Sequence, residues 1–485
     1  MKKQDLEKTS DIYKDNISEW ENYDLTYDGG LPFIKKALYR YSNLETVKNH
    51  DERVRNGYVF NYAQSIIDLY NFYLTEKPAI RKIEELDKNL QFQMFLKDAD
   101  LDNTDFNDFM KESQKISSVH GSLGLLVNKP DGDGASIYPY VARYSLPNIL
   151  DWTFERDKWT HRRVLTYLKL LEEDGSFLLM WPNRWEKWII KDKNVTELIG
   201  EGVIPLDEIP FIWMPNLKRI RNFYLGVSDI VDICRIVESI VRNLSHGEEI
   251  IKFAGFPMLR IPMERGVGPE EKDDDDSVMV GEKAVFEFDP TLGSDAKPDW
   301  MPTEIYEPIT AVLDWIDRKA EESYRIAHLS GVHGQRTSGE PSSGLALRYS
   351  TQQLYSVLEK KSKNMTEAEL QIIRLWMRWQ KLDGFDKIEI SRPKEFSIDD
   401  LAVELDNAFT SMRNMTSKRF RVKLQGKVAD HILPDLTEDD RKIINEETEK
   451  NTPDTIPLHE DSARYQTGGG DSIRPADQTS TRGRR

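Results

Sequence analysis

Two acidic stretches are the first candidates for chemistry, because clustered carboxylates can bind divalent cations. Residues 98–105 read DADLDNTD, which is similar to the opening of a calcium-binding loop. Such a loop needs Gly at its sixth position and Glu at its twelfth, but counting from Asp98 those positions hold Asn103 and Phe109. We therefore interpret this stretch as an acidic helix-capping segment. Asp273–Asp276 cannot all converge on one ion without backbone support, so we expect an exposed, solvated loop there.

The nucleophiles and imidazoles form no recognisable catalytic or zinc site. His328 and His333 lack a third metal ligand nearby, and Ser330 between them lacks the G-x-S-x-G elbow of a serine hydrolase. Cys234, the single cysteine, falls on the apolar side of a predicted helix, which indicates a buried structural thiol. Neither a phosphate-binding P-loop nor a GxGxxG fingerprint occurs. The sequence predicts no catalytic residue, no metal and no cofactor.

The composition favours a soluble protein that is not a general nucleic-acid binder. The chain has 485 residues, of which 39% are hydrophobic and 31% charged, and a formal net charge of −17. This length suggests about three domains or sub-domains, and a general nucleic-acid binder would be basic. The amino terminus lacks the apolar core of a signal peptide, and no long apolar run could span a membrane. We expect a protein without membrane contact that is made in a reducing compartment.

The first part of the chain predicts an α+β unit. Residues 1–50 are polar and are expected to form loosely docked helices, and an amphipathic helix follows at 58–78. A second helix, at 104–120, leads into a buried strand at 123–127. Residues 135–195 are rich in β-branched and aromatic side chains, which predicts a meander of antiparallel strands.

The centre of the chain predicts a pair of helices with an insertion between them. An extended connector at 208–216 precedes the pair. Apolar residues at steps of three and four then predict a helix over 226–250, for which Ser228 is the candidate N-cap. The same period predicts a returning helix over 304–327, and the intervening residues 251–303 form a compact insertion with short strands.

A long helix and a polar carboxyl-terminal region follow the pair. After a glycine-containing loop at 328–342, the helical period continues to residue 381, which corresponds to a helix about 55 Å long. A short strand follows at 385–390, another helix starts at 397–400, and a charged helix occupies 436–450. Residues 451–485 have almost no large apolar side chains and are expected to be disordered.

Two short motifs open the helices of the central region. One is Ser-Gly-x-Ala-Leu at the start of the long helix, and the other is Gly-x-Ser-Asp-Ile at the start of the first helix of the pair. Their residues are Ser343, Gly344, Ala346 and Leu347, and Gly226, Ser228, Asp229 and Ile230. With these motifs in this order, the region from about 55 to 450 resembles the portal proteins of tailed bacteriophages.

This resemblance implies a portal-type α+β fold. Its parts would be an N-terminal wing at 1–225, stem helices at 226–250 and 304–327, a small β-containing clip at 251–303, a channel (tunnel) loop at 328–342, a long wing helix with the following strand at 343–396, a helical crown at 397–450 and a disordered tail at 451–485.

The resemblance also implies a function without catalysis. Twelve subunits would form a ring at one capsid vertex, with a channel for double-stranded DNA during packaging and ejection. The ring would dock the terminase large subunit and a head–tail adaptor and contact the major capsid and scaffolding proteins. The protein would be made in the host cytoplasm and reside in the virion at the portal vertex. The channel loop would present His333, Gly334, Arg336, Thr337 and Ser338.

An enzyme remains the alternative to the portal reading. A monomeric acidic α+β protein could use its carboxylate clusters as a metal-dependent hydrolase or nuclease. The oligomeric state separates the two hypotheses, because the portal hypothesis requires a ring.

Overall fold

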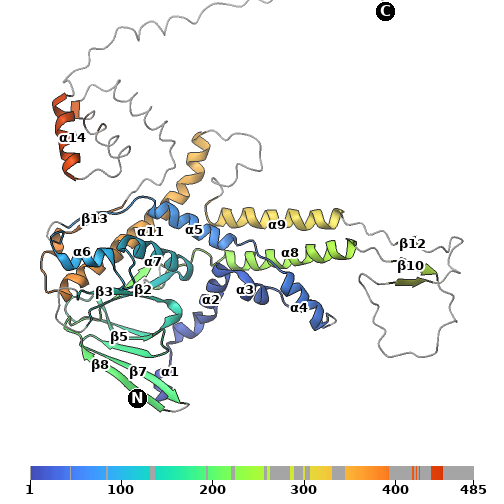
Figure 1. The fold of residues 1–485 in the computed structure, drawn as a ribbon, viewed down its shortest axis with the longest axis horizontal. Helices are drawn as coiled ribbons and strands as arrows, with labels where there is room; N and C mark the ends of the chain where they lie inside the picture. The colour runs from blue at the N-terminus through green and yellow to red at the C-terminus, as the bar shows by residue number, and fades with distance from the viewer. Residues whose placement is uncertain are drawn as a thin grey trace, which may run out of the picture. The chain divides into compact units, whose positions relative to one another are not determined.

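The computed structural model shows an α+β chain that divides into two units, Met1–Phe396 and Ser397–Arg485 (Figure 1). The structure describes residues 2–43, 45–83, 86–130, 137–192, 195–219, 224–255, 259–262, 285–288, 299–300, 306–329, 344–392, 418–419, 422, 425 and 438–451. Every described strand belongs to the first unit, and the second unit contributes helix α14 (Glu438–Asn451).

Four helices begin the chain: α1 (Lys3–Glu7), α2 (Asp11–Asp28), α3 (Gly30–Ala37) and α4 (Val47–Asn56). Ser10 caps α2 by accepting a hydrogen bond from the Tyr13 amide. The expectation of loosely docked helices is wrong, because Leu6, Trp20 and Phe33 are each at most 4% exposed. The few large apolar residues of this polar segment are the ones that fix it to the core.

A three-stranded antiparallel sheet lies at the centre of the first unit, in the order β3-β2-β9. The strands are β2 (Ser122–Asn128), β3 (Tyr140–Ser145) and β9 (Phe211–Pro215), and the helices around them include α5 (Tyr62–Thr75), α6 (Leu90–Lys97) and α7 (Phe106–His120). Strand β2 is buried along nearly its whole length, as its apolar run predicted. The connector predicted at 208–216 is extended, and part of it forms β9, which pairs with β2.

The meander predicted over 135–195 is confirmed as a second, five-stranded antiparallel sheet in sequence order. After the short helix η1 (Leu146–Asn148), its strands are β4 (Ile149–Arg156), β5 (Arg163–Leu171), β6 (Phe177–Trp181), β7 (Arg184–Asp192) and β8 (Val195–Val203). The buried Lys169 on β5 donates to the backbone carbonyls of Asp5, Leu6 and Lys8, at 2.9, 3.2 and 2.6 Å. This single side chain therefore ties α1 to the sheet.

Helices α8 (Ile233–Gly255) and α9 (Tyr306–Ile326) run side by side (Figure 1). The start predicted for α8 is wrong, because residues 226–228 are not helical, residues 229–232 form a turn and the helix begins at Ile233. Ser228 does not cap α8, because its hydroxyl is hydrogen-bonded to the Val119 carbonyl and to the Ile230 amide, which both lie outside α8. Between the two helices, the described strands β10 (Leu259–Pro262), β11 (Val285–Phe288) and β12 (Asp299–Trp300) form a small sheet in the order β11-β10-β12.

The long predicted helix is present as α11 (Gly344–Trp379), a helix of 36 residues. Its core end contributes the fully buried Trp376, whose ring meets Phe92 edge-on at 5.0 Å. Beyond it, η4 (Phe385–Lys387) leads to β13 (Glu389–Ser391), which pairs antiparallel with β1 (Ile80–Lys82). The buried Glu369 of α11 forms ion pairs with Arg81 and with Arg392, so α11 is fixed to this two-stranded sheet.

Several predictions fall outside the described residues. These are the acidic run Asp273–Asp276, the helix start at 397–400 and the tail beyond Asn451. Within the described chain, no helix has the length and apolar character needed to cross a bilayer.

Candidate functional site

The residues of the Gly-x-Ser-Asp-Ile motif are described in full, whereas those of the Ser-Gly-x-Ala-Leu motif and of the loop predicted at 328–342 are described only in part. Gly344, Ala346 and Leu347 lie in the first turn of α11, where the backbone alone is described. Outside the described residues lie Ser343 and the predicted loop residues His333, Gly334, Arg336, Thr337 and Ser338. The Gly-x-Ser-Asp-Ile motif, Gly226 to Ile230, therefore defines the site.

Gly226 lies where two segments of backbone cross. A Cβ atom on Gly226 would stand 2.0 Å from the Gly121 carbonyl oxygen, and one on Gly121 would stand 2.7 Å from the Gly226 carbonyl oxygen. Gly121 has a φ of +89° and ends α7 as its left-handed cap. The Gly226 amide donates to the Ser122 hydroxyl at 2.7 Å. The motif glycine is required because no side chain fits at this crossing.

Ser228 and Asp229 bind the end of α7. The Ser228 hydroxyl donates to the Val119 carbonyl at 2.5 Å and accepts from the Ile230 amide at 3.2 Å. The Asp229 amide donates to the Ser118 carbonyl at 3.0 Å. Helix carbonyls near a C-terminus lack partners inside the helix, and these donors supply them. Ile230 is fully buried in the main core, which holds the turn down.

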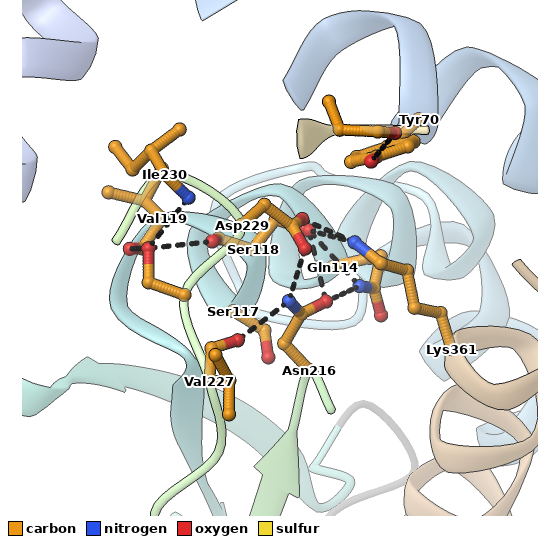
Figure 2. Close-up of polar contacts among 12 residues, drawn as sticks. Tyr70, Gln114, Ser117, Ser118, Val119, Asn216, Val227, Asp229, Ile230 and Lys361 are labelled. Carbon is orange, nitrogen blue, oxygen red and sulfur yellow. Dashed lines mark hydrogen bonds and ion pairs between the residues drawn. The ribbon is translucent and has the colours of Figure 1, made fainter. Parts of the chain in front are cut away.

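The Asp229 carboxylate forms a buried ion pair with Lys361 of α11 (Figure 2). The two side chains are 3% and 0% exposed. The Lys361 ammonium also lies 4.4 Å from the centre of the Tyr70 ring and 3.4 Å from the Ser118 hydroxyl. Burial lowers the pKa of Lys361, and the charge and hydrogen bond of Asp229 oppose that shift. Water does not reach either charge, and each one therefore compensates the other.

Asn216 connects the ion pair to the rest of the network. Its amide nitrogen donates to Asp229 at 2.8 Å and to the Val227 carbonyl at 3.0 Å. Its amide oxygen accepts from Gln114 at 3.1 Å and from the Ser118 hydroxyl at 3.2 Å (Figure 2). These contacts join α7, the segment after β9 and the turn before α8 into one polar cluster.

Tyr70 extends the cluster to the far end of α9. Its ring faces Lys361, and its hydroxyl donates to the carbonyl of Ala327, directly after α9. The cluster thus fixes the chain just before α8 begins and just after α9 ends to the same point of α11. Most polar groups in it are partnered to one another, although the side-chain oxygen of Gln114 has no hydrogen-bond partner among the described residues. The arrangement suits a rigid joint between elements.

The motif was found in the sequence, but its principal partner was missed. Lys361 follows Leu354 and Leu358 and precedes Met365 at the helical spacing of the buried face of α11. A lysine at a core-facing position signals a buried partner, because a lysine is almost never fully buried unless it is paired. Asn216 and Gln114 gave no comparable signal, because a polar residue near a helix or strand end is ordinary.

The α8–α9 hairpin has a narrow apolar contact of its own. Ile240, Leu244 and Ile316 form a cluster separate from the main core, with Ile236 and Val312 packed against it. The Lys319 ammonium donates across the pair to the Ser239 hydroxyl at 2.6 Å. Other large apolar side chains of the hairpin are exposed: Ile251 by 52%, Tyr306 by 84%, Leu313 by 54% and Trp315 by 52%.

The acidic segment 98–105 serves local backbone structure, as predicted. Asp105 caps α7 by accepting from the Asn107 amide at 2.8 Å. Asp98 accepts from the Asn103 amide, and Asp100 accepts from the amides of Asp102 and Thr104. In the part of the chain that the structure describes, no three His, Cys, Asp or Glu residues are grouped to hold a metal ion.

Cys234 is a buried thiol in the first turn of α8, as predicted. It is 1% exposed, and burial raises its pKa to about 12. We expect no reaction of the folded protein with a disulfide thiol reagent at about pH 8, because the thiolate is the reactive form. In denaturant one thiol per chain should react at once. Rapid labelling of the native protein would contradict this assignment.

Comparison with known proteins gives matches only among solved structures. No family model matches the chain, and no curated protein does. A chain from the neck of an empty gene transfer agent particle is 12% identical, with a TM-score of 0.42, over 74% of this chain and 89% of that chain. A chain of the native gene transfer agent virion is 11% identical, with a TM-score of 0.41, over 84% and 98%. A chain from the neck of the native particle is 11% identical, with a TM-score of 0.38, over 85% and 97%.

Proposed function

We propose that this protein is a portal-type subunit that assembles through its α8–α9 hairpin into a closed ring around a channel for double-stranded DNA. The observation that carries the proposal is the uneven burial of the hairpin. Its helices contact each other through Ile316 of α9 and Ile240 and Leu244 of α8. Leu313 and Trp315, within the turn that precedes Ile316, are about half exposed. Exposed apolar residues on two sides of a helix suit packing both within and between subunits.

The polar joint at the base of the hairpin supports the same proposal. The Asp229–Lys361 pair holds the chain before α8, and Tyr70 holds the chain after α9. Both ends of the hairpin are therefore attached to α11 rather than hinged on one loop. A channel wall built from such hairpins would keep its diameter under load, because each helix pair is anchored twice.

The charge of the chain suits a channel through which DNA slides. Lysine and arginine contacts to phosphate dominate DNA affinity, and a formal charge of −17 per subunit would oppose tight binding. Within the proposal, the loop at 328–342 faces the DNA with His333, Gly334, Arg336, Thr337 and Ser338. Arg336 from every subunit would then form the main basic ring.

The remaining parts of the proposal concern partners and place. The ring would contain twelve copies at one capsid vertex of the virion, and the protein would be made in the host cytoplasm. Residues 251–303 would dock the head–tail adaptor, and the ring would also contact the terminase large subunit, the major capsid protein and scaffolding protein. The subunit itself would not be catalytic, so the packaging motor would be a separate chain.

The ring is tested by removing the exposed apolar side chains of the hairpin. We expect Leu313→Ser combined with Trp315→Ser to leave the monomer folded but to abolish rings, because both side chains are already about half exposed in one chain. Mass photometry and negative-stain microscopy measure the assembly, and circular dichroism monitors the fold.

A matched control removes equally exposed apolar groups elsewhere. Val47→Ser combined with Leu90→Ser changes residues that are 63% and 67% exposed and lie outside the hairpin, so rings should persist. A wild-type chain that stays a monomer of 56.4 kDa and hydrolyses nucleic acid with a divalent cation would refute the portal proposal in favour of an enzyme.

A further inference from the structure

A groove runs along the free edge of β3. Its volume is about 960 Å³, and all six residues of β3 line it. One wall is the turn between β5 and β6 together with inward side chains of the five-stranded sheet, among them Met180 and Trp185. The opposite wall is α7 and the loop before it, from which Glu112 and Asp102 line the groove. Strand β3 thus lines the groove between two walls.

The backbone of β3 offers hydrogen bonds to this groove. Strand β3 pairs with β2 on one side only, because it is an edge strand of its sheet. The Val141 amide donates to the Ala99 carbonyl at 2.9 Å, so the backbone groups of Val141 point away from β2. Arg143 is two residues further along the strand, so its backbone groups also point away from β2. No described residue outside the sheet bonds to the Arg143 amide or carbonyl. An added strand could pair there.

The side chains around this edge select the chemistry of the added strand. Six carboxylates line the groove: Asp100, Asp102, Glu112, Glu172, Glu173 and Asp174. Its three cations are already paired with acids, Lys115 with Asp68 at 2.7 Å, Lys187 with Asp174 at 3.0 Å and Arg143 with Glu112 at 2.5 Å. The side-chain carboxylates of Asp102 and Glu173 have no hydrogen-bond or ion-pair partner among the described residues. The rim therefore carries more carboxylates than cations.

The floor of the groove is apolar and fixed. Val141 and Met180 are buried, and the Trp185 ring is held under Gly200 and Gly202, where any Cβ would approach it within about 3 Å. Trp379 is held at the far end by a hydrogen bond from its indole N–H to the Val127 carbonyl at 3.0 Å. Such a floor accepts alternate apolar side chains of an extended chain, while the rim accepts the basic residues between them.

We infer that this groove binds an extended, basic segment of a partner protein, which adds as a strand to β3. The segment would alternate lysine or arginine with apolar residues, and its backbone would bond to the free groups of Arg143. Neither β3 nor the groove belongs to the α8–α9 hairpin, so ring formation and segment binding can fail independently.

The probe is a dye-labelled, end-blocked peptide of about seven residues in which lysine alternates with valine around one tryptophan. We expect fluorescence anisotropy to show binding to the full-length protein that weakens with added salt. Amide hydrogen exchange at Arg143 should slow when the peptide binds. The same peptide with glutamate for lysine, or with methylated backbone nitrogens, should not bind, because the first reverses the charge and the second removes the strand donors.

Variants of the protein separate this site from general electrostatic attraction. Asp102→Lys combined with Glu173→Lys should weaken binding at least about tenfold. The control, Asp15→Lys combined with Glu21→Lys on α2, makes the same charge change at exposed residues away from the groove and should leave affinity unchanged. Equal binding of the methylated peptide would overturn strand addition. Binding to the monomer but not to the assembled protein would overturn the inference in favour of a second copy of this chain.

Discussion

Replacing Lys361 with methionine is expected to lower the free energy of unfolding by about 3–5 kcal/mol, because it leaves one charge of a buried pair uncompensated. Asp229, whose side chain is 3% exposed, would keep its Asn216 hydrogen bond but lose its cation. Because the joint anchors the start of α8, the loss should also reduce ring formation. Urea denaturation followed by tryptophan fluorescence measures the stability, and mass photometry measures the assembly.

The double variant Lys361→Met, Asp229→Asn is the matched control. It removes both charges and keeps an oxygen for the Asn216 amide, so we expect it to recover most of the lost stability. A double variant as unstable as the single one would show that lost packing, rather than the stranded charge, causes the effect. A fully stable Lys361→Met protein would refute the role of the pair.

The single variant Asp229→Asn should have a pH-dependent stability. Burial lowers the pKa of Lys361, and the variant removes the charge of Asp229 that opposes this shift in the wild-type protein. At pH values between the lowered pKa of Lys361 in the folded chain and its ordinary pKa in the unfolded chain, the unfolded chain binds a proton that the folded chain does not. Stability should therefore rise as the pH rises through this range, and the wild-type protein should show the effect less strongly.

Replacing Ile316 with aspartate is expected to have the second large effect. Ile316 is 4% exposed and packs against Ile240 and Leu244, so the variant would place an unpaired carboxylate between α8 and α9. Burying such a charge costs at least about 3 kcal/mol. Among the described residues, this small cluster is the apolar core of the hairpin that is separate from the main core, so we expect the two helices to separate and rings to be lost. Hydrogen exchange of α8 and mass photometry measure the two consequences.

Two controls separate charge from position. Ile316→Val removes one methylene group and should cost about 1 kcal/mol without loss of rings. Ala311→Asp adds the same carboxylate at an exposed site of α9 and should leave the contact between α8 and α9 intact. Normal rings from the Ile316→Asp variant would contradict a role for the hairpin in assembly.

Periodicity predicted the regular elements well. The spacing of apolar residues located α9 and α11, and the β-branched and aromatic residues located the five-stranded sheet. These patterns succeed because burial of one face is a local property of a helix or strand. The start of α8 was wrong by seven residues, because Val227 and Ile230 continue the apolar spacing into a turn.

The joint could be predicted only in part, because its partners come from distant parts of the chain. The motif pointed to Ser228 and Asp229 as important, but a capping role for Ser228 on α8 was the local interpretation. The actual partners of these residues are the end of α7 and Lys361, which is 132 residues from Asp229. Local pattern carries no information on which buried carboxylate a buried lysine meets. The polar sequence before α5 likewise concealed that Leu6 and Phe33 are core residues.

The pairing of β1 with β13 has a consequence for how the chain is made. Lys82 and Glu389, which face each other across these strands, are 307 residues apart in sequence. At about 5–20 residues per second, a ribosome needs roughly 15–60 s to synthesise that interval. Throughout this time the nascent chain holds β1 without its partner, and during part of it, while the 132 residues from Asp229 to Lys361 are made, Asp229 lacks its lysine. The first unit therefore completes its fold only after α11 and β13 have left the ribosome, and the apolar surface awaiting α11 is exposed to chaperones until then.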